Sequence, residues 1–171
     1  MAREREQKRV ISQQNVASMC LVCGDKNRLG LHAHFYNLED GSICADFCTT
    51  EEHQSYPGRV HGGIISAILD EVIGRAVQND HPEIWGVTME LNVRFRKPVP
   101  LGVPLRVLGR VDKRTNRIFD GSGELLLEDG TVAAEATARY ASLAVEAIAQ
   151  GGLSDEDWHS DSWQSPDSVL I

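Results

Sequence analysis

This 171-residue chain has no long apolar segment and only four cysteines, and its acidic side chains outnumber its basic ones by 25 to 17. No stretch approaches the roughly 20 apolar residues of a membrane-spanning helix, so we expect no membrane partner. The charged segment 1–9 lacks the apolar core of a secretory signal, so we expect a cytoplasmic location. The net charge of −8 argues against nucleic acid as a partner.

The cysteines and serines stand in no nucleophile motif, and a chain of this length does not need disulfide cross-links. One domain is the default for this size. Positive charge is concentrated in residues 94–117, whereas the segment after Gly151 carries five acidic residues and no lysine or arginine. The basic stretch could hold the phosphates of a small ligand, or it could simply be the solvated face of strands.

The most informative segment is His61-Gly62-Gly63, which is followed by an apolar stretch that contains Asp70. The Gly-Gly turn predicts a helix start. Free backbone N–H groups and the positive end of the helix dipole can hold a carbonyl oxygen there as it becomes negative. A carboxylate on an apolar helix face lowers the stability of the fold, so its presence there suggests a functional role. The segment therefore indicates chemistry at a carbonyl group.

We expect the helix to run from about Gly62 to Gln78, with one buried face and one solvated face. Glu71 and Arg75 fall on the solvated face, spaced as an i,i+4 ion pair. Asp70 stands about 100° from Glu71, among small and apolar residues, although it could also lie at the edge of the apolar face and reach water. The expected buried residues are Ile65, Ile68, Leu69, Val72 and Ala76.

Two strand-like segments precede the helix and four follow it. A single apolar helix must be covered, and one curved antiparallel sheet is the available cover, so we expect an α+β fold with about six strands around the helix. Residues 1–19 are expected to be an arm or polar helix, residues 20–147 the folded domain, and residues 148–171 an acidic, disordered tail. The open sheet edges predict self-association, as a homodimer or a dimer of dimers.

The order of elements resembles the hotdog fold. Five motifs resemble those of hotdog acyl-CoA thioesterases of the phenylacetate-pathway type and their four-hydroxybenzoyl-CoA thioesterase relatives, and together they cover roughly residues 20–145. One departure is Arg28, which stands where the family branch carries proline. The motifs are Cys20–Leu31, Tyr56–Gly63, Leu69–Glu71, Val87–Phe95 with Lys97–Val99, and Asp129–Ala138.

The resemblance implies hydrolysis of an acyl-CoA thioester to a free acid and coenzyme A, without metal or redox cofactor. The N–H of Gly62, together with that of Gly63, would polarise the thioester carbonyl. Asp70 would act as general base on water, or as nucleophile through an anhydride. Thr88 matches a hydroxyl residue that comes from the partner subunit in related enzymes, although it also simply suits a strand. His61 would shape the loop or act through its ring.

Many relatives carry asparagine or glutamine about six residues before the histidine of this motif, where it places substrate or water. Here that position is Ser55, with Gln54 beside it. Both are candidates for substrate binding. Arg94, Arg96 and Lys97 are candidates for binding the phosphates of coenzyme A.

Two other functions stay open for a chain of this fold. It could bind or sense acyl-CoA without catalysis, or it could hydrate an enoyl-CoA. A zinc site is an alternative for these residues: Cys20, Cys23, Cys44, Cys48, His32 and His34. Cys44 and Cys48 would lie roughly 13 Å apart on an extended strand, so we expect no metal.

Overall fold

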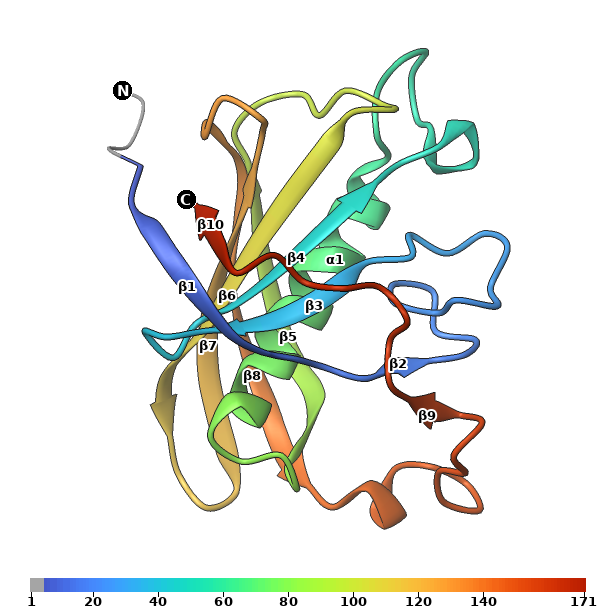
Figure 1. Cartoon of the computed structure of the whole chain (residues 1–171), viewed down its shortest axis with the longest axis vertical. Coiled ribbons are helices and arrows are strands. Elements are labelled where there is room, and N and C mark those ends of the chain that lie inside the picture. Colours follow the sequence, from blue (N-terminus) through green and yellow to red (C-terminus); the bar gives the residue numbers. More distant parts are fainter. Residues whose placement is uncertain (1–4) are drawn as a thin grey trace.

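The computed structural model describes residues 5–171, in which one long helix lies against a large antiparallel sheet (Figure 1). The helix is α1 (Gly62–Arg75). Eight strands form the sheet in the order β10-β1-β3-β4-β6-β7-β8-β5, and β2 pairs with β9 separately. The strands are β1 (Gln7–Gln13), β2 (Val16–Ala17), β3 (His34–Leu38), β4 (Ile43–Cys48), β5 (Trp85–Phe95), β6 (Pro104–Arg114), β7 (Ile118–Leu126), β8 (Val132–Leu143), β9 (Trp158–His159) and β10 (Ser168–Leu170).

The main core lies between α1 and the sheet, and it confirms the predicted α+β fold. All five helix residues that were expected to be buried are buried. The helix ends at Arg75 and continues as a 3-10 turn, Ala76–Asn79, which is close to the predicted end. No helix within residues 5–171 has the length and apolar character needed to cross a membrane.

Glycines on two strands let the helix approach the sheet closely. A Cβ on Gly109 of β6 would lie 2.6 Å from the main-chain oxygen of Val72, and one on Gly121 of β7 would lie 2.6 Å from Ile73. Gly123 is similarly crowded by Ile73, at 2.9 Å. These glycines, which weaken the strand pattern in the sequence, therefore form the surface on which α1 rests.

The two ends of the chain differ from the sequence prediction. Gln7–Gln13 is a strand rather than an arm or helix, and Ser168–Leu170 is a strand within the segment expected to be a disordered tail. These two strands pair with each other, and β1 also pairs with β3, so the sheet has eight strands instead of about six (Figure 1).

The reason is a second apolar cluster on the sheet, separate from the core under α1. Tyr36, Leu38 and Leu108 form part of this cluster. Val169 of β10 is buried in it and Val10 of β1 packs against it. Burying apolar surface stabilises a fold, so the terminal strands order themselves by covering this cluster.

Arg75 is buried, so the prediction of a solvated stripe on α1 is wrong at this residue. Its Nε donates to Glu71 Oε1 at 2.7 Å, which confirms the predicted ion pair, and its Nη1 donates to the Asn15 oxygen at 2.9 Å. The guanidinium carbon lies 4.4 Å from the centre of the Phe35 ring and 4.9 Å from that of Trp158. Burial opposes the charge, but the Glu71 carboxylate and the Cys23 and Cys20 sulfurs together outweigh it and raise the pKa of Arg75.

Candidate active site

Asp70 lies half-buried on the wall of a cavity of about 170 Å³ beside α1. Thr88 of β5 and Tyr140 of β8 also line this cavity, and so do two tryptophans. The rings of Trp85 and Trp158 meet edge to face with centres 4.8 Å apart. Trp158 belongs to β9, so the C-terminal segment supplies part of the wall.

Two hydroxyl groups hold one oxygen of the Asp70 carboxylate. Thr88 Oγ1 donates to Asp70 Oδ1 at 2.9 Å, and Tyr140 Oη lies 3.0 Å from the same oxygen and 2.8 Å from the Asp70 main-chain oxygen. Burial, with the nearby Asp70 charge, raises the pKa of Tyr140, so its hydroxyl stays a donor. Within residues 5–171, no hydrogen bond reaches Asp70 Oδ2.

Strand pairing explains how these two hydroxyls meet at Asp70. Thr88 and Tyr140 are direct partners in the β5–β8 ladder, and a bulge follows Thr88 before Glu90 pairs with Arg139. Side chains opposite each other on one face of a sheet lie close together. The contact with Asp70 is made within one chain, whereas the family resemblance implied a hydroxyl from the partner subunit.

Tyr140 is a functional candidate that the sequence analysis missed. It shares the buried side of β8 with alanines at every second position, Ala134, Ala136 and Ala138. That period of two was available from the sequence, because alternate residues of a strand face the same way. A single large polar ring at the end of a row of small residues was the signal.

The start of α1 offers one free backbone donor. His61 is the N-cap, and its Nδ1 accepts a hydrogen bond from the Gly63 N–H at 2.9 Å. The Gly62 N–H has no partner among the described residues. Of the two predicted oxyanion donors, Gly62 is therefore available and Gly63 is engaged by His61, whose ring shapes the turn. A Cβ added to Gly62 would lie 3.4 Å from the Phe95 ring.

Gln54 and Ser55, the predicted substrate-binding pair, are exposed in the loop before α1 and do not line the Asp70 cavity. Gln54 Oε1 accepts from the Gly58 N–H at 3.0 Å. The Ser55 N–H donates to the Arg59 oxygen at 2.9 Å. In this structure both residues stabilise their own loop.

The three predicted phosphate-binding residues lie at the far end of β5 from Thr88. Arg94 is six residues beyond Thr88, which is about 20 Å along a strand. Arg94 lies 3.9 Å from Glu135, and Arg96 forms a closer ion pair with the same carboxylate. Lys97 is exposed. A Cβ on Gly62 would lie 3.4 Å from the Phe95 ring, so this basic group is near the start of α1 rather than near Asp70.

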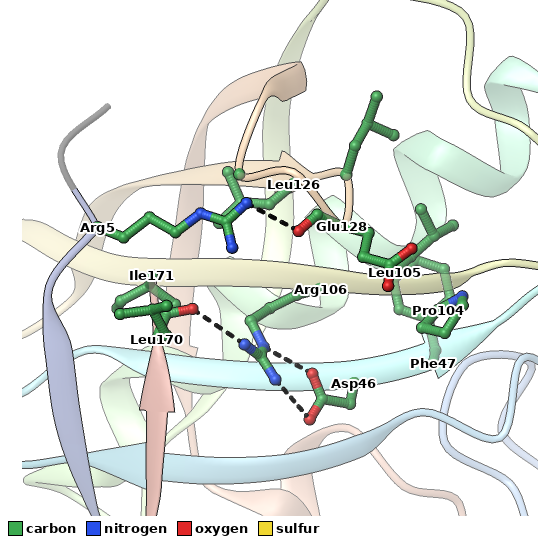
Figure 2. Close-up of a pocket in the computed structure, with 12 residues that line it drawn as sticks. Arg5, Asp46, Phe47, Pro104, Leu105, Arg106, Leu126, Glu128, Leu170 and Ile171 are labelled. Atoms are coloured by element: carbon green, nitrogen blue, oxygen red, sulfur yellow. Dashed lines mark hydrogen bonds and ion pairs between the residues drawn. The ribbon is translucent and has the colours of Figure 1, made fainter. Parts of the chain in front are cut away.

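A second cavity, of about 360 Å³, lies between β4, β6 and the C-terminal strand (Figure 2). Its two arginines bond to a carboxylate or to main-chain oxygens. Arg106 forms a bidentate pair with Asp46, at 2.7 and 3.2 Å, and donates to the Leu170 oxygen at 3.1 Å. Arg5 donates to the Glu128 oxygen at 2.9 Å. These contacts hold the terminal strands in place, and we assign no reaction to this cavity.

The four cysteines do not gather at one point. Cys44 is buried beside the Tyr36 hydroxyl, at 3.3 Å, and Cys48 is exposed. Cys20 and Cys23 instead lie together beside Glu71 of α1. The hydrogen bond between their thiols lowers the pKa of Cys20 to about 6 and raises that of Cys23.

Residues 57–134 match the model of a family described as the thioesterase superfamily. The chain is 30% identical over 113 residues to the acyl-coenzyme A thioesterase THEM4 of Mus musculus, covering 66% of this chain and 48% of that protein. It is also 30% identical over 100 residues to a candidate esterase of Saccharolobus solfataricus, covering 58% of this chain and 71% of that protein. The chain thus spans about half the length of the mouse thioesterase.

Solved structures share the fold. One protein of the thioesterase superfamily aligns with a TM-score of 0.66 at 30% identity, covering 71% of this chain and 62% of that one. A phenylacetic acid degradation-related protein of Ralstonia eutropha JMP134 aligns with a TM-score of 0.59 at 28% identity, covering 65% and 85%. These matches confirm the family resemblance noted in the sequence.

Proposed function

The chain belongs to the thioesterase superfamily, and from this and the geometry of Asp70 we propose that it hydrolyses an acyl-CoA thioester to a free acid and coenzyme A. The main support for this proposal is that two hydroxyl groups fix Asp70 Oδ1, while Oδ2 has no hydrogen-bond partner within residues 5–171. One carboxylate oxygen is thus oriented by the fold, and the other can react. The mouse relative named as an acyl-coenzyme A thioesterase supports the substrate class.

In the proposed reaction, Asp70 Oδ2 takes a proton from water as the water oxygen attacks the thioester carbon. Electrons move onto the carbonyl oxygen, and when they return the carbon–sulfur bond breaks. The proton held by Asp70 then passes to the coenzyme A thiolate. In the alternative route, Asp70 attacks the thioester directly and water hydrolyses the resulting anhydride. Neither route places a metal or redox cofactor at the reacting atoms.

The Gly62 N–H is our proposed donor to the carbonyl oxygen as it becomes negative, because it is a free backbone donor at a helix start. Eight residues separate Gly62 from Asp70 on one helix, a rise of about 12 Å. The carbon and oxygen of a carbonyl are only about 1.2 Å apart. This separation favours a site in which Gly62 of one protomer and Asp70 of its partner serve the same thioester.

We propose that the edge strand β5 forms that interface, in a homodimer or a dimer of dimers. β5 is the last strand of the sheet next to β8. It exposes Val87, Met89 and Phe95, with exposed fractions of 37%, 61% and 53%. An uncovered edge with apolar side chains favours pairing with another strand. The Phe95 ring at this edge lies 3.4 Å from where a Cβ on Gly62 would be, so an interface here would bring a partner close to the helix start.

The test is Asp70→Asn, with Asp80→Asn as the control at an exposed acid outside the cavity. Release of free thiol from a panel of short-chain, long-chain and aromatic acyl-CoA esters is measured. We expect turnover to fall by roughly 10² to 10⁴ in Asp70→Asn, with little change in melting temperature, and to be unchanged in the control. Unchanged turnover in a folded Asp70→Asn protein would refute the assignment.

The same panel separates the competing functions. Tight binding of acyl-CoA to the wild-type protein without thiol release would favour a binding or regulatory role. Loss of the conjugated absorbance of an enoyl-CoA would favour a hydratase. A single turnover in ¹⁸O-labelled water tests the anhydride route, because label in the Asp70 carboxylate arises only when water attacks the Asp70 carbonyl of an anhydride.

A further inference from the structure

A compact group of side chains of the types that ligate metals lies beside the Asp70 cavity, which Glu71 also lines. Cys20 Sγ, Cys23 Sγ and a Glu71 carboxylate oxygen all lie within 4.8 Å of one another, and Cys20 Sγ is 3.9 Å from Glu71 Oε1. Ligand atoms on one tetrahedral zinc ion are about 3.5 to 3.8 Å apart, given the usual bond lengths. We propose that Cys20, Cys23 and Glu71 bind one zinc ion, with water as the fourth ligand.

The loop that carries the two cysteines is closed tightly enough to hold both sulfurs in place. The Gly24 N–H donates to the Cys20 oxygen at 3.0 Å. A Cβ on Gly24 would lie 2.7 Å from the Cys20 nitrogen and 2.8 Å from the Ser18 oxygen, so this turn requires glycine. Such a preformed pair of ligands does not have to be assembled when a metal binds.

The sulfur atoms are surrounded by hydrogen-bond donors. The N–H groups of Val22 and Cys23 point to Cys20 Sγ at 3.3 and 3.5 Å. The Ala17 N–H and Arg75 Nη2 point to Cys23 Sγ at 3.3 and 2.9 Å. A neutral thiol is a weak acceptor. Donors from the surroundings commonly orient and tune metal-bound thiolates, so this pattern suits two sulfurs in their metal-binding form.

The charges at the group also match a divalent cation. In the proposed metal-bound form, two thiolates and the Glu71 carboxylate carry three negative charges, and the buried Arg75 supplies one positive charge. The remaining two negative charges are those that a divalent ion neutralises. Thiolate ligands select zinc over magnesium and calcium, which prefer oxygen ligands. Cys20 is only partly buried, which leaves the ion a way in.

The zinc ion would connect the loop that follows β2 to helix α1. Glu71 is the residue next to Asp70, and both Glu71 and Arg75 line the Asp70 cavity. A metal bound there fixes the helix face that carries the carboxylate, without touching the thioester. The site is distinct from the proposed hydrolysis, and its presence is measurable without any substrate.

The experiment uses the full chain, treated with a chelator under reducing conditions and then dialysed. Titration with Zn²⁺ against a chromophoric chelator should show one tight site per chain. Co²⁺ should give the near-ultraviolet charge-transfer absorption of a cobalt–thiolate bond. We expect Cys20→Ser and Cys23→Ser each to weaken binding by at least about 100-fold. Cys48→Ser, at the exposed cysteine on β4, is the matched control and should bind like the wild-type chain.

Alkylation provides a readout that needs no variant, in case the serine variants fail to fold. Zn²⁺ should slow the reaction of iodoacetamide with Cys20 but not with Cys48. The proposal is overturned if the wild-type chain binds no stoichiometric Zn²⁺, or if Zn²⁺ leaves the modification rate of Cys20 unchanged. A third result would also overturn the proposal. In it, the chain purified without reductant carries a Cys20–Cys23 disulfide, and the chain binds no metal after that disulfide is reduced. None of these results depends on thioester hydrolysis.

Discussion

The Tyr140 hydroxyl contacts Asp70 at two oxygens, the side-chain Oδ1 at 3.0 Å and the main-chain oxygen at 2.8 Å. The Tyr140 ring is itself fixed, since it is almost fully buried and stacks on Phe119 with centres 4.8 Å apart. The position of the carboxylate is therefore set by a rigid aromatic ring in the sheet rather than by the helix alone. This relationship makes Tyr140 a testable part of the proposed site.

Replacing Tyr140 by phenylalanine keeps the ring and removes both hydrogen bonds. A hydrogen bond to a charged group contributes about 1.5 to 3 kcal/mol, so we expect kcat for thioester hydrolysis to fall by roughly 10- to 100-fold. Tyr36→Phe is the control, because it also removes a buried hydroxyl, one that bonds to Asp46 instead. The control should lose stability but keep its kcat. Equal kcat values in both variants would contradict a role for Tyr140 at the site.

The two buried tyrosines also predict how stability depends on pH. Burial is the largest cause that raises the pKa of Tyr36 and of Tyr140 in the folded chain. In the unfolded chain a tyrosine loses its proton at about pH 10. Above that pH the unfolded state binds fewer protons than the folded state, so the free energy of unfolding falls as the pH rises.

Urea unfolding between pH 9 and pH 11 checks this behaviour, with pH values chosen to span the ordinary tyrosine pKa of about 10. Each buried tyrosine should contribute a slope of up to about 1.4 kcal/mol per pH unit above pH 10. Tyr140→Phe should therefore have a shallower alkaline decline than the wild-type chain. An identical slope would mean that Tyr140 ionises equally readily in both states.

Substitutions of His61 can distinguish a structural role of its ring from a chemical one. Its ring accepts the Gly63 N–H at the helix start, a contact that another N-cap residue can replace. We expect His61→Ala to lower the free energy of unfolding by about 1 kcal/mol and to reduce activity. His61→Asn should restore both, because an asparagine oxygen also caps a helix. If His61→Asn recovers stability but not thiol release, the imidazole itself takes part in the reaction.

The central elements were predictable from the sequence because local patterns determine them. The Gly-Gly turn and the apolar period of α1 predicted the helix and its buried face, and they placed Asp70 at the border of that face. The residues near the helix start were also identified, because a helix N-terminus always has free N–H groups. The sequence could not show which of these N–H groups stays free. The Gly63 N–H is bonded to the His61 ring, and that bond depends on the rotamer of His61.

The remaining errors come from long-range contacts that leave no local signal. Arg75 looks like a surface residue by its spacing from Glu71, yet Trp158, more than 80 positions later, covers it. Likewise β1 forms only because β10 and β3 lie beside it. Neither partner is apparent from the composition of the terminal segments, which are polar and resemble disordered chain.

The close approach of α1 to the sheet makes Gly109 sensitive to a single methyl group. A Cβ at this position would lie 2.6 Å from the main-chain oxygen of Val72, which cannot move without displacing the helix. We expect Gly109→Ala to lower the free energy of unfolding by about 1 to 3 kcal/mol, the usual cost of overpacking. Ser122→Ala, at a half-buried position on the neighbouring strand, should cost less. Urea unfolding of both variants measures the difference.

Burial decides how much an ion pair contributes, and two pairs in this chain allow a direct comparison. Arg75 and Glu71 interact at 2.7 Å with only 7% of the arginine side chain exposed, whereas Arg139 and Asp120 interact at the same distance with 48% of the arginine exposed. Arg75→Met keeps most of the apolar contact with Phe35 and Trp158 but strands the Glu71 carboxylate. The Glu71 side chain stays 28% exposed, so water replaces part of the lost interaction, and we expect the loss to stay below the roughly 3 to 5 kcal/mol of breaking a fully buried pair.

Arg139→Met is the matched control and should cost less than Arg75→Met, because water replaces the lost partner of Asp120. Urea unfolding at neutral pH gives both values. In low salt and in high salt the difference between wild type and Arg75→Met should persist, since a buried pair is poorly screened, while any effect of Arg139→Met should shrink. Equal losses for the two variants would show that the C-terminal segment does not shield Arg75 from water in solution.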